Sequence, residues 1–260
     1  MRLTSLGSGS SGNAFVLQHH EATVLLDCGV GVRAVQKALA RYGKLSSVII
    51  SHEHSDHVRS LSSVLKKHAC EVVATEGTLG AIGRPGGWRA IRAGGRIEID
   101  SLSISFVGVS HDAAEPCGFL VESPGVKIAI LTDLGCVDAE VLDVLSVADV
   151  AVFESNYDEG MLRRGHYPAH LKRRIRSAVG HLSNEDCAVA LAHSARPEMS
   201  RVWLSHLSHN NNSPRAAIAT TEEALLAAGK PIPVTALARF EPTQILPFVA
   251  PPRQRNLFDV

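Results

Sequence analysis

One short segment constrains this chain more than any other: the sequence HEHSDH, which begins at His52, directly follows the apolar run SVIIS at residues 47–51. A continuous apolar run of this length is typical of a buried strand, whose end can hold ligands rigidly at the edge of a sheet. Alternate residues of an extended loop point the same way, so His52 and His54 can share one metal ion. Asp56 and His57 then project toward a second position at the start of a helix. The segment therefore predicts a metal site, for which imidazole and carboxylate favour zinc, with manganese or iron as competitors.

The composition is that of a folded protein. The chain has 260 residues, of which 45% are hydrophobic and 20% charged, so wholesale disorder is excluded. Lys plus Arg and Asp plus Glu number 26 each, so binding of nucleic acid would need a local basic patch or bound metal. The five cysteines include no CxxC pair, which fits a reducing compartment. No signal core or long apolar run is evident, so we expect a cytoplasmic protein without membrane contact.

Hydrophobic periodicity predicts a strand-rich first part followed by alternating strands and helices. One domain over residues 1–249, with two sheets and helices outside, is the simplest architecture. Residues 250–260 have the composition of a mobile end. We expect strands at 2–6, 14–18, 23–27, 47–51, 71–74, 97–99, 102–108, 118–123, 127–131, 149–154, 201–204, 233–236 and 245–248, and helices at 32–42, 57–68, 138–145, 168–177, 184–194 and 214–228.

The HEHSDH segment resembles the HxHxDH motif of the metallo-β-lactamase superfamily, and further motifs follow in the order typical of that superfamily. The resemblance implies an α+β fold, a four-layer αβ/βα sandwich of two packed sheets. It also implies two divalent metal ions, zinc or manganese, held by seven ligands. In this assignment His52, His54 and His111 hold the first ion, Asp56, His57 and His206 hold the second, Asp133 bridges both, and Asp27 is structural.

Other segments narrow the resemblance to the YycJ/WalJ subgroup, whose members are DNA exonucleases. These segments are LGSGSSGN near the start, GHLSN around His181, and LSHLS around His206. The resemblance implies a dinuclear phosphodiesterase, most simply a DNA exonuclease that cleaves by metal-activated hydroxide, with DNA as its substrate. Asp56 would hold the proton of the nucleophile. His181 resembles the histidine that protonates the leaving oxygen in related tRNA-processing nucleases, although a purely structural role beside the ligands explains its position too.

Two alternatives remain open at the level of the sequence. A small-molecule phosphodiester or thioester hydrolase of the same fold would have the same ligands, because fold and ligands do not set the substrate. A metal-binding regulatory or scaffold protein is the alternative outside the enzymes, and the intact ligand set weighs against it. The sequence does not fix the oligomeric state.

Two further segments offer contacts to a nucleic acid. The turn from Gly7 to Gly12 carries Ser10 and Ser11, which can face a phosphate, although a tight turn between strands explains this segment as well. Arg173 and Arg174 belong to a basic run that ends near His181. Contact with the phosphate backbone is one interpretation of that run, and a solvated helix face is the other.

The C-terminal residues Gln254, Leu257 and Phe258 resemble the peptide by which bacterial replication and repair proteins bind the DNA sliding clamp. Such a peptide needs an extended backbone, a polar anchor and apolar side chains that fill a pocket. Pro251 and Pro252 favour extension. The alternative is that Leu257 and Phe258 pack on the surface of the domain itself.

Overall fold

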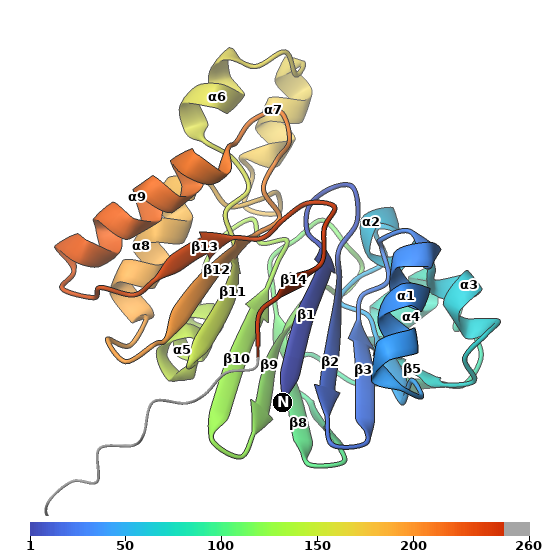
Figure 1. The fold of residues 1–260 in the computed structure, drawn as a ribbon. Coiled ribbons are helices and arrows are strands. Elements are labelled where there is room, and N and C mark those ends of the chain that lie inside the picture. Colours follow the sequence, from blue (N-terminus) through green and yellow to red (C-terminus); the bar gives the residue numbers. More distant parts are fainter. Residues whose placement is uncertain (247–260) are drawn as a thin grey trace, which may run out of the picture.

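The computed structural model describes residues 1–246, in which two mixed sheets face each other and helices cover their outer sides (Figure 1). The predicted four-layer sandwich is confirmed. The single domain over residues 1–249 stays a prediction, and the tail at 250–260 lies outside the described residues. Within the described part, no helix has both the length and the apolar character that a bilayer crossing requires.

The first sheet combines antiparallel pairing among its N-terminal strands with parallel pairing from β3 onward. Hairpins join the three N-terminal strands, helices join the parallel strands, and the last strand of the described chain pairs antiparallel with the first. In spatial order the sheet consists of β14 (Thr243–Gln244), β1 (Arg2–Gly7), β2 (Ala14–His19), β3 (Ala22–Leu26), β4 (Ser47–Ile49), β5 (Glu71–Ala74) and β6 (Trp88–Ala90).

The second sheet repeats this plan. Its strands pair antiparallel from β7 to β10 and parallel from β10 to β13. In spatial order it consists of β13 (Val234–Ala236), β12 (Arg201–Ser205), β11 (Val150–Glu154), β10 (Val126–Leu131), β9 (Cys117–Ser123), β8 (Leu102–Gly108) and β7 (Arg96–Ile99).

Apolar side chains from both sheets form the central layer of the core. Phe106 and Phe119 lie there edge to face, with ring centroids 5.5 Å apart, a favourable geometry for aromatic pairs. Separate apolar clusters hold the helices against the outer faces. The first sheet is covered by α1 (Val32–Tyr42), α2 (Ser55–Val58), α3 (Leu61–Leu65) and α4 (Glu76–Ala81), and the second by α5 (Ala139–Val147), α8 (Asn184–Ser194) and α9 (Pro214–Ala227).

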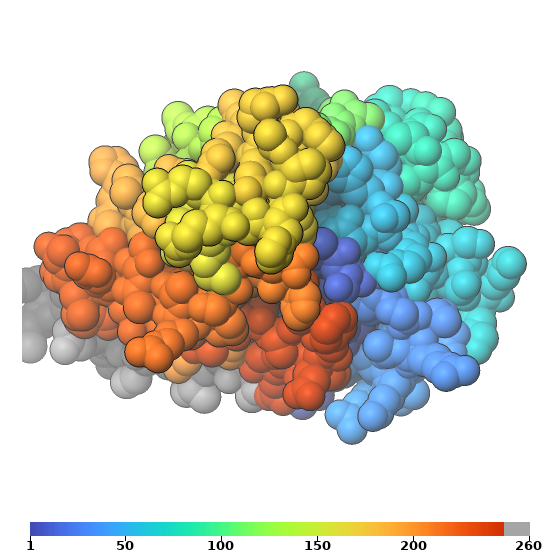
Figure 2. All heavy atoms as spheres, turned by 90° about the horizontal axis from the view of Figure 1, so that it is seen from above, coloured from blue at the N-terminus to red at the C-terminus, as the bar shows by residue number. Residues whose placement is uncertain are grey.

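Two short helices, α6 (Glu159–Arg164) and α7 (Ala169–Ile175), rise above one edge of the sandwich (Figure 1). Seen from above, this yellow segment lies between the orange part of the chain and the parts coloured blue and green (Figure 2). Within each sheet, parallel neighbours run in the same direction, so their ends lie along one edge. In both sheets this is the edge of the sandwich nearest α6 and α7 (Figure 1). The loops that follow them are thereby gathered beneath α6 and α7.

The structure corrects several predicted elements. The single helix expected at 57–68 is two helices, α2 and α3, because Ser60 between them bonds to the carbonyls of Cys28 and Val30 and turns the chain. The strand expected at 245–248 is wrong at Ile245 and Leu246, since β14 ends at Gln244, and 247–248 lie outside the described residues. Three short elements, α4, β6 and α6, were not expected.

Candidate metal centre

Loops from both sheets bring the predicted ligands to one edge of the sandwich. The HEHSDH segment follows β4, the loop between β8 and β9 carries His111, and the ends of β10 and β12 carry Asp133 and His206. Gly29 lies so close to the HEHSDH backbone that a Cβ there would be 1.5 Å from the carbonyl oxygen of Asp56. Only glycine permits this approach, which fixes where the segment turns into α2.

Two aspartates and one histidine that follow strand ends have a backbone conformation that residues other than glycine rarely adopt. Asp27, Asp133 and His206 have φ values of 58°, 59° and 54°, in the left-handed region. Each such residue costs on the order of 1–3 kcal/mol and persists only where its surroundings fix it. At His206, the backbone N–H donates to Ser8 Oγ at 2.8 Å. The strain thus points to a preorganised site.

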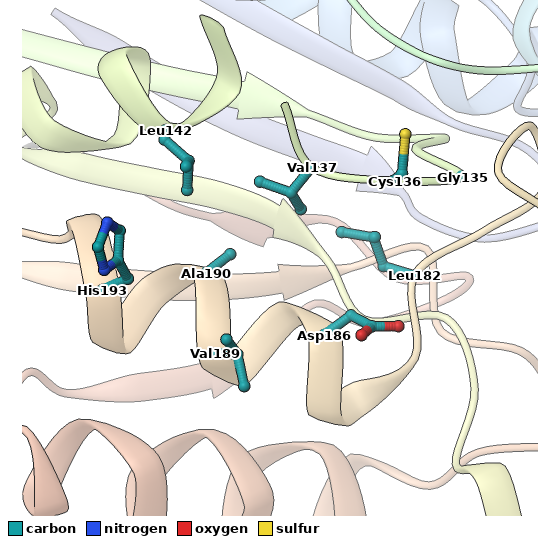
Figure 3. Close-up of a pocket in the computed structure, with 9 residues that line it drawn as sticks. All are labelled: Gly135, Cys136, Val137, Leu142, Leu182, Asp186, Val189, Ala190 and His193. Carbon is teal, nitrogen blue, oxygen red and sulfur yellow. The ribbon is translucent and has the colours of Figure 1, made fainter. Parts of the chain in front are cut away.

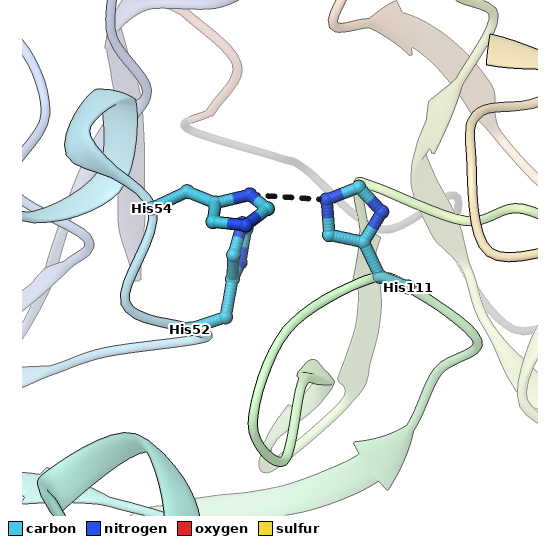
Figure 4. Close-up of side chains that lie close together, drawn as sticks. All are labelled: His52, His54 and His111. Atoms are coloured by element: carbon cyan, nitrogen blue, oxygen red, sulfur yellow. Dashed lines mark hydrogen bonds between the residues drawn. The ribbon is translucent and has the colours of Figure 1, made fainter. Parts of the chain in front are cut away.

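A first group of ligand atoms consists of imidazoles alone. One ring nitrogen each from His52, His54 and His111 lies within 4.8 Å of the others (Figure 4), and His54 Nδ1 is 3.3 Å from His111 Nε2. His111 Nδ1 donates to the carbonyl of Gly180 at 3.0 Å, which directs Nε2 toward the group. Burial lowers the pKa of both His52 and His111. Neutral imidazole is the form that binds metal, so this group fits a cation.

A second group contains carboxylates as well as imidazoles. His57 Nε2 is 3.1 Å from Asp133 Oδ2 and 3.8 Å from Asp56 Oδ2. His206 Nε2 is 3.7 Å from the same Asp56 oxygen. Ligand atoms about 2.1 Å from one zinc ion in a tetrahedron are roughly 3.4 Å apart, so these separations suit a single ion. Asp133 lies between the two groups, since its Oδ1 is 3.9 Å from His111 Nε2.

Hydrogen bonds orient the second group from behind. Asp27 accepts from the Ser51 backbone and from His57 Nδ1, both at 2.8 Å, so His57 Nε2 faces Asp133. Burial alone would lower the pKa of His57, but Asp27 and Asp133 raise it to about 10. Buried negative charge at this point would be balanced equally well by a cation. In addition, His52 Nε2 and His206 Nε2 are buried without a hydrogen-bond partner among residues 1–246, as expected for metal-facing atoms.

Glu154 is a functional residue that the sequence analysis missed. It is fully buried at the end of β11. Its Oε1 accepts from His181 Nδ1 at 2.8 Å and from His206 Nδ1 at 3.1 Å, and its Oε2 accepts from the Leu134 backbone. The signal in the sequence was a carboxylate at the end of an apolar strand, the same signal that marks Asp27 and Asp133.

His181 lies between the two groups of ligands. Its ring centroid is 5.2 Å from that of His111 and 5.1 Å from that of His206. Its side chain is 17% exposed, so one edge of the ring is open to solvent. His181 also forms, with Asp133, Glu154 and His206, a cluster whose side chains could hold a metal ion. His181 therefore lies at the centre, where its side chain could transfer a proton or bind a metal ion, and its role stays a prediction.

The remaining predicted residues lie at the rim or outside the described chain. Ser10 and Ser11 are exposed on the turn between β1 and β2, and Arg173 is exposed on α7. Arg174, also on α7, pairs with Asp112 beside His111. The structure thus brings the seven predicted ligands and His181 together, while substrate contacts stay a prediction. Gln254, Leu257 and Phe258 lie outside the described residues.

A separate groove opens behind the loop that follows Asp133 (Figure 3). It holds about 350 Å³ and lies against α5 and α8. None of the predicted ligands lines it, so it is distinct from the metal centre. Its lining residues are Gly135, Cys136, Val137, Leu142, Leu182, Asp186, Val189, Ala190 and His193.

Fold and ligand arrangement together define a class of protein, and comparison with known families agrees. The family described as "Beta-lactamase superfamily domain" matches residues 22–207, and the chain belongs to this superfamily. It is a metal-dependent hydrolase, as the motifs predict.

Similar proteins narrow the family further. The chain is 35% identical over 235 residues to "Exodeoxyribonuclease YycJ" of Bacillus anthracis, covering 86% of this chain and 89% of that protein. It is 32% identical over 228 residues to "Exodeoxyribonuclease WalJ" of Streptococcus pneumoniae, covering 80% and 81%. The metallo-β-lactamase fold protein YhfI of Bacillus subtilis superposes with a TM-score of 0.72 at 15% identity, over 94% of this chain and 98% of that one. The YycJ/WalJ resemblance is confirmed, and YhfI supports the fold.

Proposed function

We propose that this protein is a dinuclear-metal phosphodiesterase that acts on DNA as an exonuclease. The observation that carries the proposal is the position of Asp133, which lies against both groups of ligands: its Oδ2 is 3.1 Å from His57 Nε2, and its Oδ1 is 2.9 Å from His206 Nδ1 and 3.9 Å from His111 Nε2. A carboxylate so placed can bridge two ions. The names of the similar proteins YycJ and WalJ support DNA as the substrate.

In this proposal two ions would occupy neighbouring positions. His52, His54 and His111 would hold one, Asp56, His57 and His206 the other, and Asp133 would contact both. Zinc and manganese suit these nitrogen and oxygen ligands. When bound, two divalent ions would supply activation of water and neutralisation of the charge that develops on the phosphate.

Protein side chains would handle the protons. Asp56 is partly exposed, at 19% of its side chain, and its carboxylate can hold the proton of the attacking water. His181 can deliver a proton from Nε2 to the leaving oxygen, because its Nδ1–H is fixed by Glu154.

Neutral net charge is compatible with a polyanionic substrate in this account. The two ions would provide the cationic focus that the composition lacks. Ser10, Ser11 and Arg173 would contact the strand at the rim, and the tail residues Gln254, Leu257 and Phe258 would bind the sliding clamp. Clamp binding would raise the local concentration of DNA.

The test compares substrates for the metal-loaded protein. End-labelled single- and double-stranded DNA and RNA are incubated beside bis(p-nitrophenyl) phosphate and a thioester. The proposal predicts stepwise shortening of DNA from an end, with little turnover of the thioester. Turnover of the small ester or thioester without attack on DNA would instead establish a small-molecule hydrolase, and no turnover of any substrate would favour a regulatory metal-binding protein.

A further inference from the structure

Basic side chains on α6 and α7 differ in what they contact. Some of them bond within this segment, whereas Arg174 on α7 faces the metal centre. Lys172 Nζ donates to the carbonyls of Arg163 and Gly165, and Arg176 pairs with Glu159. These contacts hold α6 and α7 together. Arg174 alone among the paired residues of the run reaches out of this segment, to Asp112.

Asp112 connects Arg174 to the first group of ligands. Its Oδ2 accepts from Arg174 Nε at 2.6 Å. Its Oδ1 is 3.5 Å from His111 Nε2 and 4.0 Å from His54 Nε2. The Asp112 carboxylate therefore lies directly between the Arg174 guanidinium and the ring nitrogens of His54 and His111.

Hydrogen bonds to backbone carbonyls fix the end of α7 relative to these ligands. The segment that follows α7 bonds to three consecutive residues of the His111 loop. Ser110 Oγ donates to the Ala178 carbonyl, the Asp112 N–H donates to the Val179 carbonyl, and His111 Nδ1 donates to the Gly180 carbonyl. The position of Arg174 beside the centre is thus built into the fold and does not depend on one surface ion pair.

Within residues 1–246, Arg174 keeps donors free for another partner. A guanidinium has five N–H donors in a planar fork, and Nε accounts for the bond to Asp112. The side chain is 53% exposed, so its terminal nitrogens can reach an incoming anion. A phosphate matches the fork of a guanidinium, because it can accept two parallel hydrogen bonds.

We propose that Arg174 binds a phosphate of the substrate strand next to the one being cleaved, and that Asp112 acts as a positioning residue that holds Arg174 for this contact. The inference rests on the proposed function and deepens it. Neighbouring phosphates of a strand are separated by a sugar. Similarly, the Asp112 carboxylate separates the Arg174 guanidinium from the ligand atom of His111, so Arg174 would meet a neighbouring phosphate. The substrate class is then a chain of phosphodiesters, and a single diester lacks the group that Arg174 recognises.

The experiment compares Arg174→Ala and Arg174→Lys with a matched control, Arg41→Ala. Arg41 is exposed in the last turn of α1, which runs away from the metal centre toward the opposite edge of the sheet. For each metal-loaded variant, kcat and KM are measured on a single-stranded oligodeoxynucleotide and on bis(p-nitrophenyl) phosphate. Affinity is measured separately with a phosphorothioate oligonucleotide that resists cleavage.

We expect Arg174→Ala to lower kcat/KM on the oligonucleotide by about 10- to 100-fold, mainly through KM. Turnover of the small diester should stay within about twofold. The salt dependence of oligonucleotide affinity should become shallower by about one unit of log–log slope. Arg174→Lys should recover part of the loss, and Arg41→Ala should resemble the parent protein.

Three outcomes would overturn the proposal. Equal losses of kcat/KM on both substrates would show that Arg174 contacts the reacting phosphate or is needed for the site to fold. An unchanged oligonucleotide affinity would remove its role altogether, even if the parent protein cleaves DNA as proposed. A parent protein that neither binds nor cleaves the oligonucleotide, yet hydrolyses the small diester, would overturn the proposed function and this inference together.

The positioning role of Asp112 has its own readout. Asp112→Asn keeps an oxygen that can accept from Arg174 but removes the charge. We expect full metal content by elemental analysis, and a loss of oligonucleotide affinity that is not additive with that of Arg174→Ala. Loss of an ion in Asp112→Asn would show that Asp112 is a ligand and would contradict the positioning role.

Discussion

The two groups of ligands at this centre are built differently. His52, His54 and His111 form a group that contains imidazoles alone, and His54 is 30% exposed. The group around His57 and His206 is buried, contains carboxylates, and is hydrogen-bonded from behind by Asp27 and Glu154. Since affinity and exchange of an ion depend on ligand charge and on the hydrogen bonds that orient the ligands, two ions held here should not behave alike.

The largest effect should come from the residue that the two groups share. Asp133→Ala removes the carboxylate between the groups and leaves His57 and His206 without their buried partner. We expect fewer than one ion per chain by elemental analysis, and activity at background on DNA. His206→Ala is the comparison, because it should spare the first group and retain about one ion. Two ions in purified Asp133→Ala would show that the groups are independent.

Next in size is the effect of removing the proton donor between the groups. His181→Ala should lower kcat by roughly 10²–10⁴ while metal content stays unchanged. The defect should shrink on p-nitrophenyl esters, whose leaving group needs no proton. Glu154→Gln should act in the same direction, because an amide oxygen is a weaker acceptor for the His181 Nδ1–H that orients the ring. Loss of an ion from His181→Ala would instead identify His181 as a ligand.

A smaller effect is expected on metal release: the two groups should lose their ions at different rates. With a colorimetric chelator in excess, we expect two phases of zinc release at least about tenfold apart. The faster phase should belong to the exposed imidazole group. His54→Ala should therefore abolish the fast phase, and His57→Ala the slow one. A single phase that both variants alter equally would contradict the difference between the groups.

The smallest effect concerns stability and pH in the chelated protein. The pKa of His57 is raised from 6.5 to about 10 by Asp27 and Asp133, against the effect of burial. Because the pKa of His57 is higher in the folded than in the unfolded protein, protonated His57 stabilises the fold. This contribution is complete below pH 6.5 and is lost as the pH rises through about 10. Tm of the chelated protein should therefore fall across this range, and Asp27→Asn should flatten the fall. A Tm that rises with pH over the same range would contradict this reading of His57.

Much of the centre could be predicted because its ligands follow apolar strands. His52, Asp133 and His206 each stand directly after such a run, so the periodicity that reveals the strand also locates the ligand. The outer fold was predictable for the same reason. Helix α1, for example, begins at Val32 and ends at Tyr42 as its spacing predicts.

What the sequence could not show depends on contacts between distant segments. Glu154 joins His181 and His206 across separate loops, and no local pattern marks that triple contact. Likewise, the pairing of Arg174 with Asp112 spans 62 residues. The break between α2 and α3 arises from a turn that Ser60 makes against Val30, while the apolar spacing continues across it.

The most direct test of the account is a metal titration followed by DNA hydrolysis. Chelated protein is titrated with manganese or zinc, and cleavage of end-labelled DNA is measured at each equivalent. A shared centre predicts that activity appears mainly with the second equivalent and that products shorten from one end. Full activity after one equivalent, or none on DNA after two, would contradict the claim that two unlike groups form one phosphodiesterase centre.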